Sequence, residues 1–310
     1  MEKRKEVKCL VWDLDNTLWD GTLLEQDTVR LKPGIKELIA ELDARGILHS
    51  IASKNNYEDA IGKLREFGLE EYFLYPQINW NSKAESVKNI QQRLNIGMDA
   101  IVFIDDQPFE RDEVASMHPE LQTIDASEYL QIPGNPRFRP VFITEDARRR
   151  RLMYLEDMRR TKDEEEYKGP KEEFLASLNM EFIISEAKEQ DLQRAEELTV
   201  RTNQLNATGR TYSYDELHAY MHNNNFKLFV CELTDRYGSY GKIGLALVEI
   251  TGTHWILHML LMSCRVLSRS AGSILLTYIM QQAFTAGKKL KAYFRETGRN
   301  KMMYVTFRFA

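Results

Sequence analysis

The feature that most constrains this chain is the alternation of short apolar runs with helical patterns over residues 7–125. Residues 7–13 form an apolar run without polar alternation, which is typical of a strand buried on both faces. Further strands are predicted at 47–52, 100–104 and 121–124, with helices at 33–45, 57–67, 83–94 and 109–117. Strands that alternate with helices predict an α/β fold with a parallel sheet covered on both faces.

A chain of 310 residues is long enough for two domains. The proline-rich stretch IPGNPRFRP breaks the alternation, and we expect a first domain over 1–140, a charged helical linker over 141–173 and a second domain over 174–310. Strand-like runs in the second domain, separated by turn residues, predict an α+β fold with a mainly antiparallel sheet. These runs are MEFIIS, KLFVCELTD, KIGLALVEI, HWILHMLLM and LKAYF, with helices predicted at 189–202 and 271–286.

The linker is dominated by charge, with arginines at 148–151 and glutamates at 164–166. Two interpretations stay open: a solvated connecting helix, or a surface for an acidic partner.

Composition excludes several classes of protein. The net charge of −5 argues against nucleic-acid binding. The sequence contains no run of about 18 apolar residues, so no membrane span is predicted. The N-terminus has no apolar core of a signal peptide. Three cysteines, Cys9, Cys231 and Cys264, form no disulfide framework or zinc motif. We therefore expect a reduced, cytoplasmic protein.

Polar side chains follow each predicted strand of the first domain. Asp13 and Asp15 end the first strand in VWDLDNTLW, Ser53 follows ILHSIA, and Asp105–Asp106 end AIVFI. Lys83 opens a helix after the loop NWNS. Ligands of open α/β sheets bind at the carboxyl ends of the strands, so these groups are candidates for one site.

This set resembles the four motifs of the haloacid-dehalogenase superfamily, in order across residues 7–117. The resemblance implies a Rossmannoid phosphatase fold in which Asp13 is the nucleophile and Asp15 the general acid and base. It also implies a Mg²⁺ ion held by Asp13, the main-chain carbonyl of Asp15, and Asp105, with Asp106 sharing or tuning that role. Phosphate would be bound by Thr17, Ser53 and Lys83, although a turn-capping role suits Thr17 equally.

The spacing of these motifs leaves no room for an inserted cap domain. Helices 33–45 and 57–67 use most of the chain between Asp13, Ser53 and Lys83. We therefore expect a capless, open site, which suits a large substrate or closure by a partner domain.

In the second domain, the segment LLMSCRVLSRSAGSILL places a polar turn between an apolar strand and an apolar helix. Main-chain amides in such a turn suit a phosphate group. The turn is similar to the R-x-x-G-x-G/A loop of GNAT-type acyltransferases, so Arg265, Ser268 and Arg269 are candidates for binding a phosphopantetheine arm. Cys264 ends the strand and is a candidate thiolate nucleophile, the alternative being a buried core cysteine.

The polar stretch RTNQLNATGR supplies further candidates. Asn203, Gln204 and Asn206 suit contacts to substrate hydroxyls or to the pantetheine arm, and capping or turn roles remain open for each. Cys9 and Cys231 lie within predicted strands, where we expect core positions.

The two halves together resemble the FkbH-like family of glyceryl transferase/phosphatases. The resemblance rests on KCLVWDLDNTLWDG, IASKNN, FIDDQPFERDEV, RTNQLNATGRTYS, TDRYGSYGKIGLALVE, LMSCRVLSR and TGRNKMMYVTFRF. It implies transfer of a glyceryl unit from 1,3-bisphosphoglycerate to an acyl carrier protein, with loss of phosphate, for polyketide biosynthesis. Asp20, His258 and Ser268 depart from the family pattern, which weakens the inference about the acyl unit.

Three other functions compete with this interpretation. They are a stand-alone phosphatase whose C-terminal domain binds the target, an N-acyltransferase with a vestigial phosphatase domain, and an assembly factor that only docks a carrier protein. The vestigial case is disfavoured because Asp13, Asp15, Ser53, Lys83 and Asp105 are all present.

Overall fold

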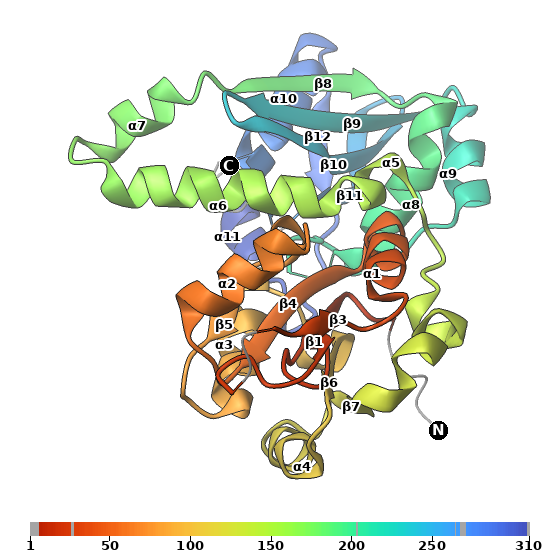
Figure 1. Ribbon diagram of the computed structural model, residues 1–310. Coiled ribbons are helices and arrows are strands. Elements are labelled where there is room, and N and C mark those ends of the chain that lie inside the picture. Colours follow the sequence, from red (N-terminus) through yellow and green to blue (C-terminus); the bar gives the residue numbers. More distant parts are fainter. Residues whose placement is uncertain (1–5, 26–27, 203, 264, 267–270, 309–310) are drawn as a thin grey trace. The chain divides into compact units, whose positions relative to one another are not determined.

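The computed structural model describes residues 6–25, 28–202, 204–263, 265–266 and 271–308. The chain divides into two compact units, Met1–Leu155 and Glu156–Ala310, which are coloured red to green and green to blue in Figure 1. Each unit is described by itself.

Unit 1 is built on a five-stranded parallel sheet with the order β5-β4-β1-β6-β7. The central strand β1 pairs on both edges, so the residues that follow it emerge at the middle of the sheet's carboxyl edge. The strands of the sheet are β1 (Cys9–Trp12), β4 (Leu48–Ser53), β5 (Gln77–Ile78), β6 (Ile101–Asp105) and β7 (Gln122–Asp125).

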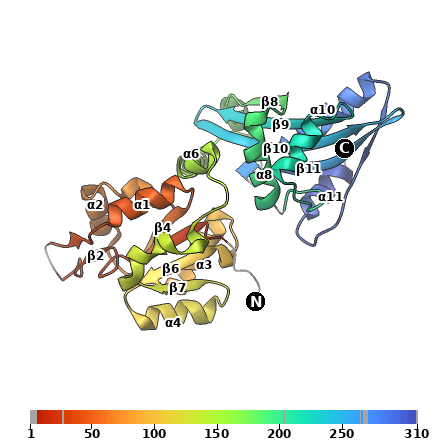
Figure 2. The same cartoon turned by 90° about the vertical axis from the view of Figure 1, so that its right-hand side faces the viewer.

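Helices cover both faces of this sheet (Figure 2). Because parallel crossovers are right-handed, α1 and α2 lie on one face, and α3 and α4 pack against each other on the other. The bounds are α1 (Ile35–Ala44), α2 (Tyr57–Glu66), α3 (Lys83–Leu94) and α4 (Pro108–Met117). Short 3₁₀ helices connect them: η1 (Glu70–Tyr72), η2 (Met98–Ala100), η3 (Ala126–Gly134) and η4 (Pro136–Phe138).

The predicted parallel α/β fold of this unit is confirmed. The prediction missed β5 and the two-stranded ribbon formed by β2 (Trp19–Asp20) and β3 (Arg30–Leu31). Strands of two residues are too short to show an alternation of apolar and polar residues. The described residues between β1 and α1 form only this ribbon, and those between β4 and α3 form α2, η1 and β5. These described segments contain no inserted cap domain, as the spacing predicted.

Unit 2 contains a five-stranded sheet with the order β12-β11-β10-β9-β8, antiparallel except where β12 joins β11. This confirms the predicted α+β class. The strands are β8 (Glu181–Glu186), β9 (Phe226–Asp235), β10 (Gly238–Ile250), β11 (His254–Met262) and β12 (Lys289–Ala292).

Each face of this sheet has its own core. Helices α8 (Leu192–Arg201) and α9 (Tyr214–Met221) pack on one face, against Leu245, Met259 and Leu261. Helices α10 (Ala271–Thr285) and α11 (Lys301–Arg308) pack on the other, against Cys231 and Leu260. Neither α9 nor α11 was predicted, and η5 (Glu189–Asp191) precedes α8.

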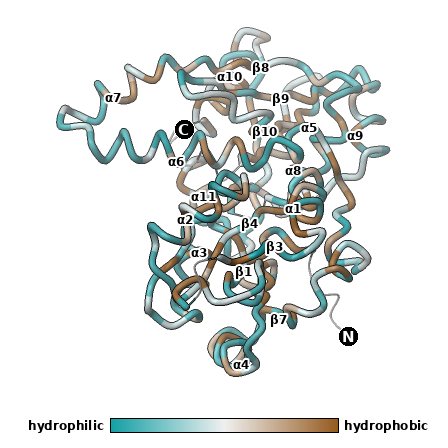
Figure 3. The backbone as a smooth tube through the Cα atoms, viewed as in Figure 1, coloured by the Kyte–Doolittle hydropathy of each residue, from teal (hydrophilic) through white to brown (hydrophobic). Residues whose placement is uncertain are grey.

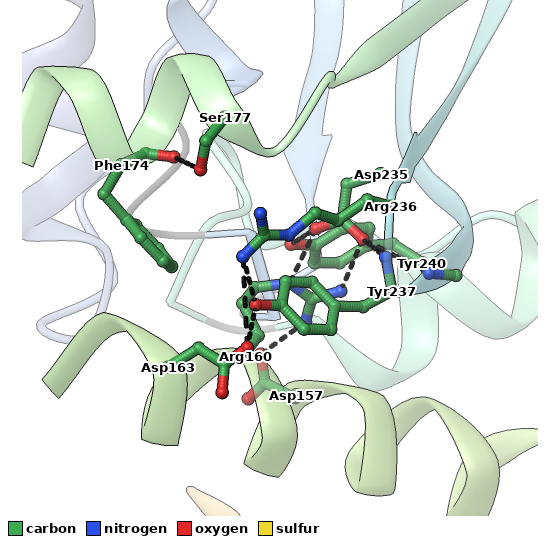
Figure 4. A network of polar contacts seen from close by, with 10 residues as sticks. Asp157, Arg160, Asp163, Phe174, Ser177, Asp235, Arg236, Tyr237 and Tyr240 are labelled. Atoms are coloured by element: carbon green, nitrogen blue, oxygen red, sulfur yellow. Dashed lines mark hydrogen bonds and ion pairs between the residues drawn. The ribbon is translucent and has the colours of Figure 1, made fainter. Parts of the chain in front are cut away.

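The charged linker folds into α5 (Glu145–Arg148), α6 (Arg150–Glu166) and α7 (Lys171–Ser177). Figure 3 shows a mostly hydrophilic α6, yet several of its arginines bind the chain itself. Arg150 donates to the carbonyl of Gly46 at 2.6 Å, and Arg151 lies 3.0 Å from Asp43, all within unit 1. Arg160, in unit 2, is fully buried beside Asp235 (Figure 4). The linker segment is therefore helical, but it is not fully solvated.

No helix in the described part of the chain is long and apolar enough to cross a membrane.

Candidate active site

Asp13 occupies the position directly after the central strand of unit 1. Its backbone N–H donates to the carbonyl of Ile104 at 3.0 Å, which continues the pairing of β1 with β6 by one residue. Its side chain therefore lies at the carboxyl edge of the sheet and is only 4% exposed. A carboxylate there is shielded from water but adjacent to the loops that can receive a ligand.

Lys83 brings a positive charge to Asp13 from the start of α3. The side chain of Ser82 caps this helix by accepting from the N–H of Glu85 at 3.1 Å, which sets where Lys83 leaves the loop. The Lys83 Nζ atom lies 2.9 Å from Asp13 Oδ1 and 2.5 Å from Asp105 Oδ2. Burial alone would lower the pKa of Lys83, but the two carboxylates outweigh burial and raise it. Lys83 is thus held as a cation.

A third carboxylate completes an acidic cluster at the end of β6. Oxygen atoms of Asp13, Asp105 and Asp106 lie within 4.8 Å of one another, and Asp106 Oδ1 is buried with no hydrogen-bond partner among the described residues. Burial and the charge of Asp13 raise the pKa of Asp105 to about 7 and also raise that of Asp106. A divalent cation would offset the repulsion among the three carboxylates and would give Asp106 Oδ1 a partner. Mg²⁺ prefers oxygen ligands of this kind.

Thr17 ties the two aspartate loops together. Its hydroxyl donates to Asp13 Oδ2 at 3.3 Å and accepts from the backbone N–H of Asp106 at 3.1 Å, and its side chain is buried. The preceding residue, Asn16, has a φ of 53°, a left-handed conformation that asparagine tolerates. The structure therefore gives Thr17 an orienting contact, and binding of phosphate by Thr17 stays a prediction.

Ser53 ends β4, the strand next to β1, and is 4% exposed. Its carbonyl accepts from the N–H of Asn79 at 3.1 Å, which holds the two neighbouring loops together. The parallel pairing therefore places the Ser53 and Asp13 positions at the same sheet edge, as the sequence predicted.

Asp15 is held by three donors and is only partly buried. Trp19 Nε1 and the N–H of Leu23 donate to Oδ1 at 2.7 and 3.0 Å, and Asn55 Nδ2 donates to Oδ2 at 2.9 Å. Burial is the main reason that the pKa of Asp15 is raised, which favours the protonated form that a general acid needs. Neither Trp19 nor Asn55 was identifiable from the sequence as a partner of Asp15, because their side chains meet Asp15 only through the fold.

The candidate residues of unit 2 are described only in part. Asn206 is buried, and its side chain accepts from the N–H groups of Thr208 and Gly209 and donates to the carbonyl of Arg210. This is the turn role left open above. Arg265 is partly buried near Ser263 Oγ, 3.4 Å from its Nε. The predictions for Asn203, Cys264, Ser268 and Arg269 lie outside the described residues.

Cys9 and Cys231 are both fully buried, as predicted. Burial raises the pKa of each thiol far above its usual range, which leaves both unreactive.

A carboxylate next to a buried ammonium group and beside an oxygen-rich cation site can attack a phosphorus atom, because charge neutralisation dominates phosphoryl transfer. Residues 21–126 match the family model described as haloacid dehalogenase-like hydrolase, a stretch that includes Ser53, Lys83, Asp105 and Asp106. Unit 1 carries a haloacid dehalogenase-like hydrolase domain. Human magnesium-dependent phosphatase 1 is 29% identical over 119 residues, which cover 32% of this chain and 68% of that protein.

Solved structures are similar to parts of the chain. The N-terminal, phosphatase-domain part of a Bacteroides fragilis protein, solved with Mg, is 31% identical, with a TM-score of 0.38, and the alignment covers 41% of this chain and 39% of that one. The ribosomal-protein-S18-alanine N-acetyltransferase of Escherichia coli is 15% identical with a TM-score of 0.34, and the alignment covers 42% of this chain and 76% of that one.

Proposed function

We propose that unit 1 is a Mg²⁺-dependent phosphatase that works through an aspartyl-phosphate on Asp13. The observation that carries this proposal is the buried contact of Asp13 with Lys83, 2.9 Å apart, inside the cluster of Asp13, Asp105 and Asp106. The match of residues 21–126 to a hydrolase family and the likeness to a magnesium-dependent phosphatase support it.

The reaction has two displacement steps. In the first, an oxygen of Asp13 bonds to phosphorus, the ester P–O bond breaks, and Asp15 gives its proton to the leaving oxygen. In the second step, the oxygen of a water molecule bonds to phosphorus and the bond between Asp13 and phosphorus breaks. The water gives its proton to Asp15. Lys83 balances charge on Asp13 and on the phosphate. Mg²⁺ held by Asp13, Asp105 and Asp106 would neutralise phosphate oxygens.

The finer proposal concerns the substrate. The FkbH-like motifs support 1,3-bisphosphoglycerate as donor and an acyl carrier protein as acceptor, with Cys264 holding the glyceryl group as a thioester. The Cys264 thiolate would attack carbon 1 and release the carbon-1 phosphate, and Asp13 would remove the carbon-3 phosphate. The thiol of the carrier protein's phosphopantetheine arm would then take the acyl group and free Cys264.

Removal of metal should abolish hydrolysis of p-nitrophenyl phosphate. In EDTA we expect a loss of at least about 100-fold, because the acidic cluster would lack its counter-charge, and added Mg²⁺ should restore the rate. Thermal unfolding supplies a second measurement, since Mg²⁺ should raise the Tm of the wild type. Full activity in EDTA, after dialysis, would contradict the metal requirement.

The acyl relay is tested by intact-protein mass spectrometry with 1,3-bisphosphoglycerate and Mg²⁺. We expect a thiol-sensitive glyceryl adduct on the wild type, absent from Cys264→Ala and retained in Cys231→Ala, whose replaced thiol is buried. A phosphopantetheinylated carrier protein should remove the adduct.

A stand-alone phosphatase is the second candidate, because every described group of the phosphatase site comes from unit 1. In that case unit 2 would bind the target. Release of phosphate by the wild type with no adduct on any variant, and full activity of Cys264→Ala, would favour it over the relay.

A further inference from the structure

We infer that Asn55 is a positioning residue, which selects the oxygen of Asp15 that exchanges a proton with substrate and water. This inference rests on the proposed phosphatase function of unit 1. It concerns a side chain that is 1% exposed and whose amide donates to Asp15 Oδ2 at 2.9 Å.

The two oxygens of Asp15 are bound differently. Oδ1 accepts from both Trp19 Nε1, at 2.7 Å, and the N–H of Leu23, at 3.0 Å. Within the described part of the chain, Oδ2 accepts only from Asn55. A carboxyl oxygen has two lone-pair directions, so two donors fill Oδ1, whereas one donor leaves a direction of Oδ2 for a proton. Oδ2 is therefore the atom suited to proton transfer, and Asn55 fixes its direction.

The orientation of the Asn55 amide follows from its own backbone surroundings. Asn55 Oδ1 accepts from the N–H of Asn56 at 3.1 Å, which assigns the Nδ2 end to Asp15. Asn56 in turn caps α2, because its side chain accepts from the N–H groups of Glu58 and Asp59. The backbone N–H of Asn56 therefore fixes the amide of Asn55, which lies two residues after Ser53, the end of β4.

The chemical consequence can be measured in the first step of the reaction. When the ester P–O bond breaks, the proton on Asp15 Oδ2 must point at the leaving oxygen, and a misaligned proton is transferred poorly. A leaving group that departs as a stable anion needs no proton. Loss of Asn55 should therefore harm substrates with poor leaving groups and spare those with good ones.

The experiment compares kcat/KM for phenyl phosphate and p-nitrophenyl phosphate in the full-length protein with Mg²⁺. For Asn55→Leu, which keeps the size but removes the donor, we expect about a 10- to 100-fold loss with phenyl phosphate. With p-nitrophenyl phosphate we expect less than about a threefold loss, because nitrophenolate leaves unaided. Because kcat/KM reports steps up to the first irreversible one, it isolates formation of the aspartyl-phosphate.

Asn56→Ala is the matched control, since it removes the side-chain cap of α2 but keeps the backbone N–H that binds Asn55 and every contact to Asp15. It should lower stability by about 1 kcal/mol with the same small effect on both substrates. In an Asp15→Asn background, Asn55→Leu should add no further selective loss.

Equal losses with both substrates, or no loss with either, would overturn the positioning role. Lack of wild-type hydrolysis of both substrates would instead remove the phosphatase proposal itself.

Discussion

Asp13→Asn is expected to abolish phosphate release while leaving unit 1 folded. The amide keeps the size of the carboxylate but cannot form the aspartyl-phosphate, so we expect a loss of at least about 10⁴-fold in kcat. Because Asp13, Asp105 and Asp106 crowd together, removing one negative charge also relieves repulsion in the metal-free protein. The Tm measured in EDTA should therefore not fall below that of the wild type.

Two measurements distinguish loss of the nucleophile from a general loss of structure. Mass spectrometry after rapid acid quenching should detect a phosphorylated wild-type protein and no phosphorylated Asp13→Asn protein. Asp112→Asn is the matched control, because Asp112 is exposed on α4 of the same unit and should keep wild-type activity. Substantial turnover by Asp13→Asn would show that the attacking group lies elsewhere.

Arg160→Met is expected to destabilise unit 2 by about 3–5 kcal/mol, because it leaves Asp235 buried without its ionic partner. Arg160 binds Asp235 through two parallel contacts, Nε to Oδ2 at 2.6 Å and Nη2 to Oδ1 at 3.0 Å (Figure 4). Its guanidinium also stacks on Tyr240, 4.2 Å from the ring centroid. Denaturant unfolding followed by circular dichroism should measure the difference.

The neighbouring Arg159 supplies the control. It is exposed on the same helix, so Arg159→Met should change stability by no more than about 0.5 kcal/mol. Arg160→Lys should recover only part of the loss, because an ammonium group cannot make both contacts to Asp235. A loss for Arg160→Met no larger than that for Arg159→Met would refute the anchoring role of Arg160.

The stabilisation by the ion pair of Arg160 and Asp235 also has a predictable pH dependence. Burial alone would raise the pKa of Asp235, but Arg160 and the N–H of Tyr237 outweigh burial and lower it. Because the folded pKa is lowered, this stabilisation is present above the unfolded value of about 3.9 and is lost as pH falls through the folded pKa. The difference between wild type and Arg160→Met should therefore shrink in acid.

Much of the fold was predictable because its signals are local. The apolar run before Asp13 and the helical spacing in 33–45, ended by Gly46, predicted β1 and α1 to within two residues. The two-residue strands β2, β3 and β5 gave no such signal. They exist because neighbouring strands or loops pair with them, and pairing is decided by distant parts of the chain.

The character of the linker was also beyond sequence reasoning. A run of arginines predicted a solvated or partner-binding surface, but Arg150, Arg151 and Arg160 bind acceptors that lie far away in sequence. Charge composition predicts the average exposure of a helix. It does not predict that one arginine is buried, because burial requires the fold to bring a partner such as Asp235 to that arginine.

For the candidate site, the sequence by itself determined which residue types stand at the ends of the strands. Asp13, Ser53 and Asp105 were identifiable because carboxyl ends of parallel strands share one edge. Only the tertiary structure decided the contacts among side chains. It brought Lys83 between Asp13 and Asp105, and it brought Asn55 to Asp15. A hydrogen bond or ion pair requires its two atoms to be placed to within a few tenths of an ångström, here between residues 22 to 70 positions apart in the chain, and motif spacing does not encode such placement.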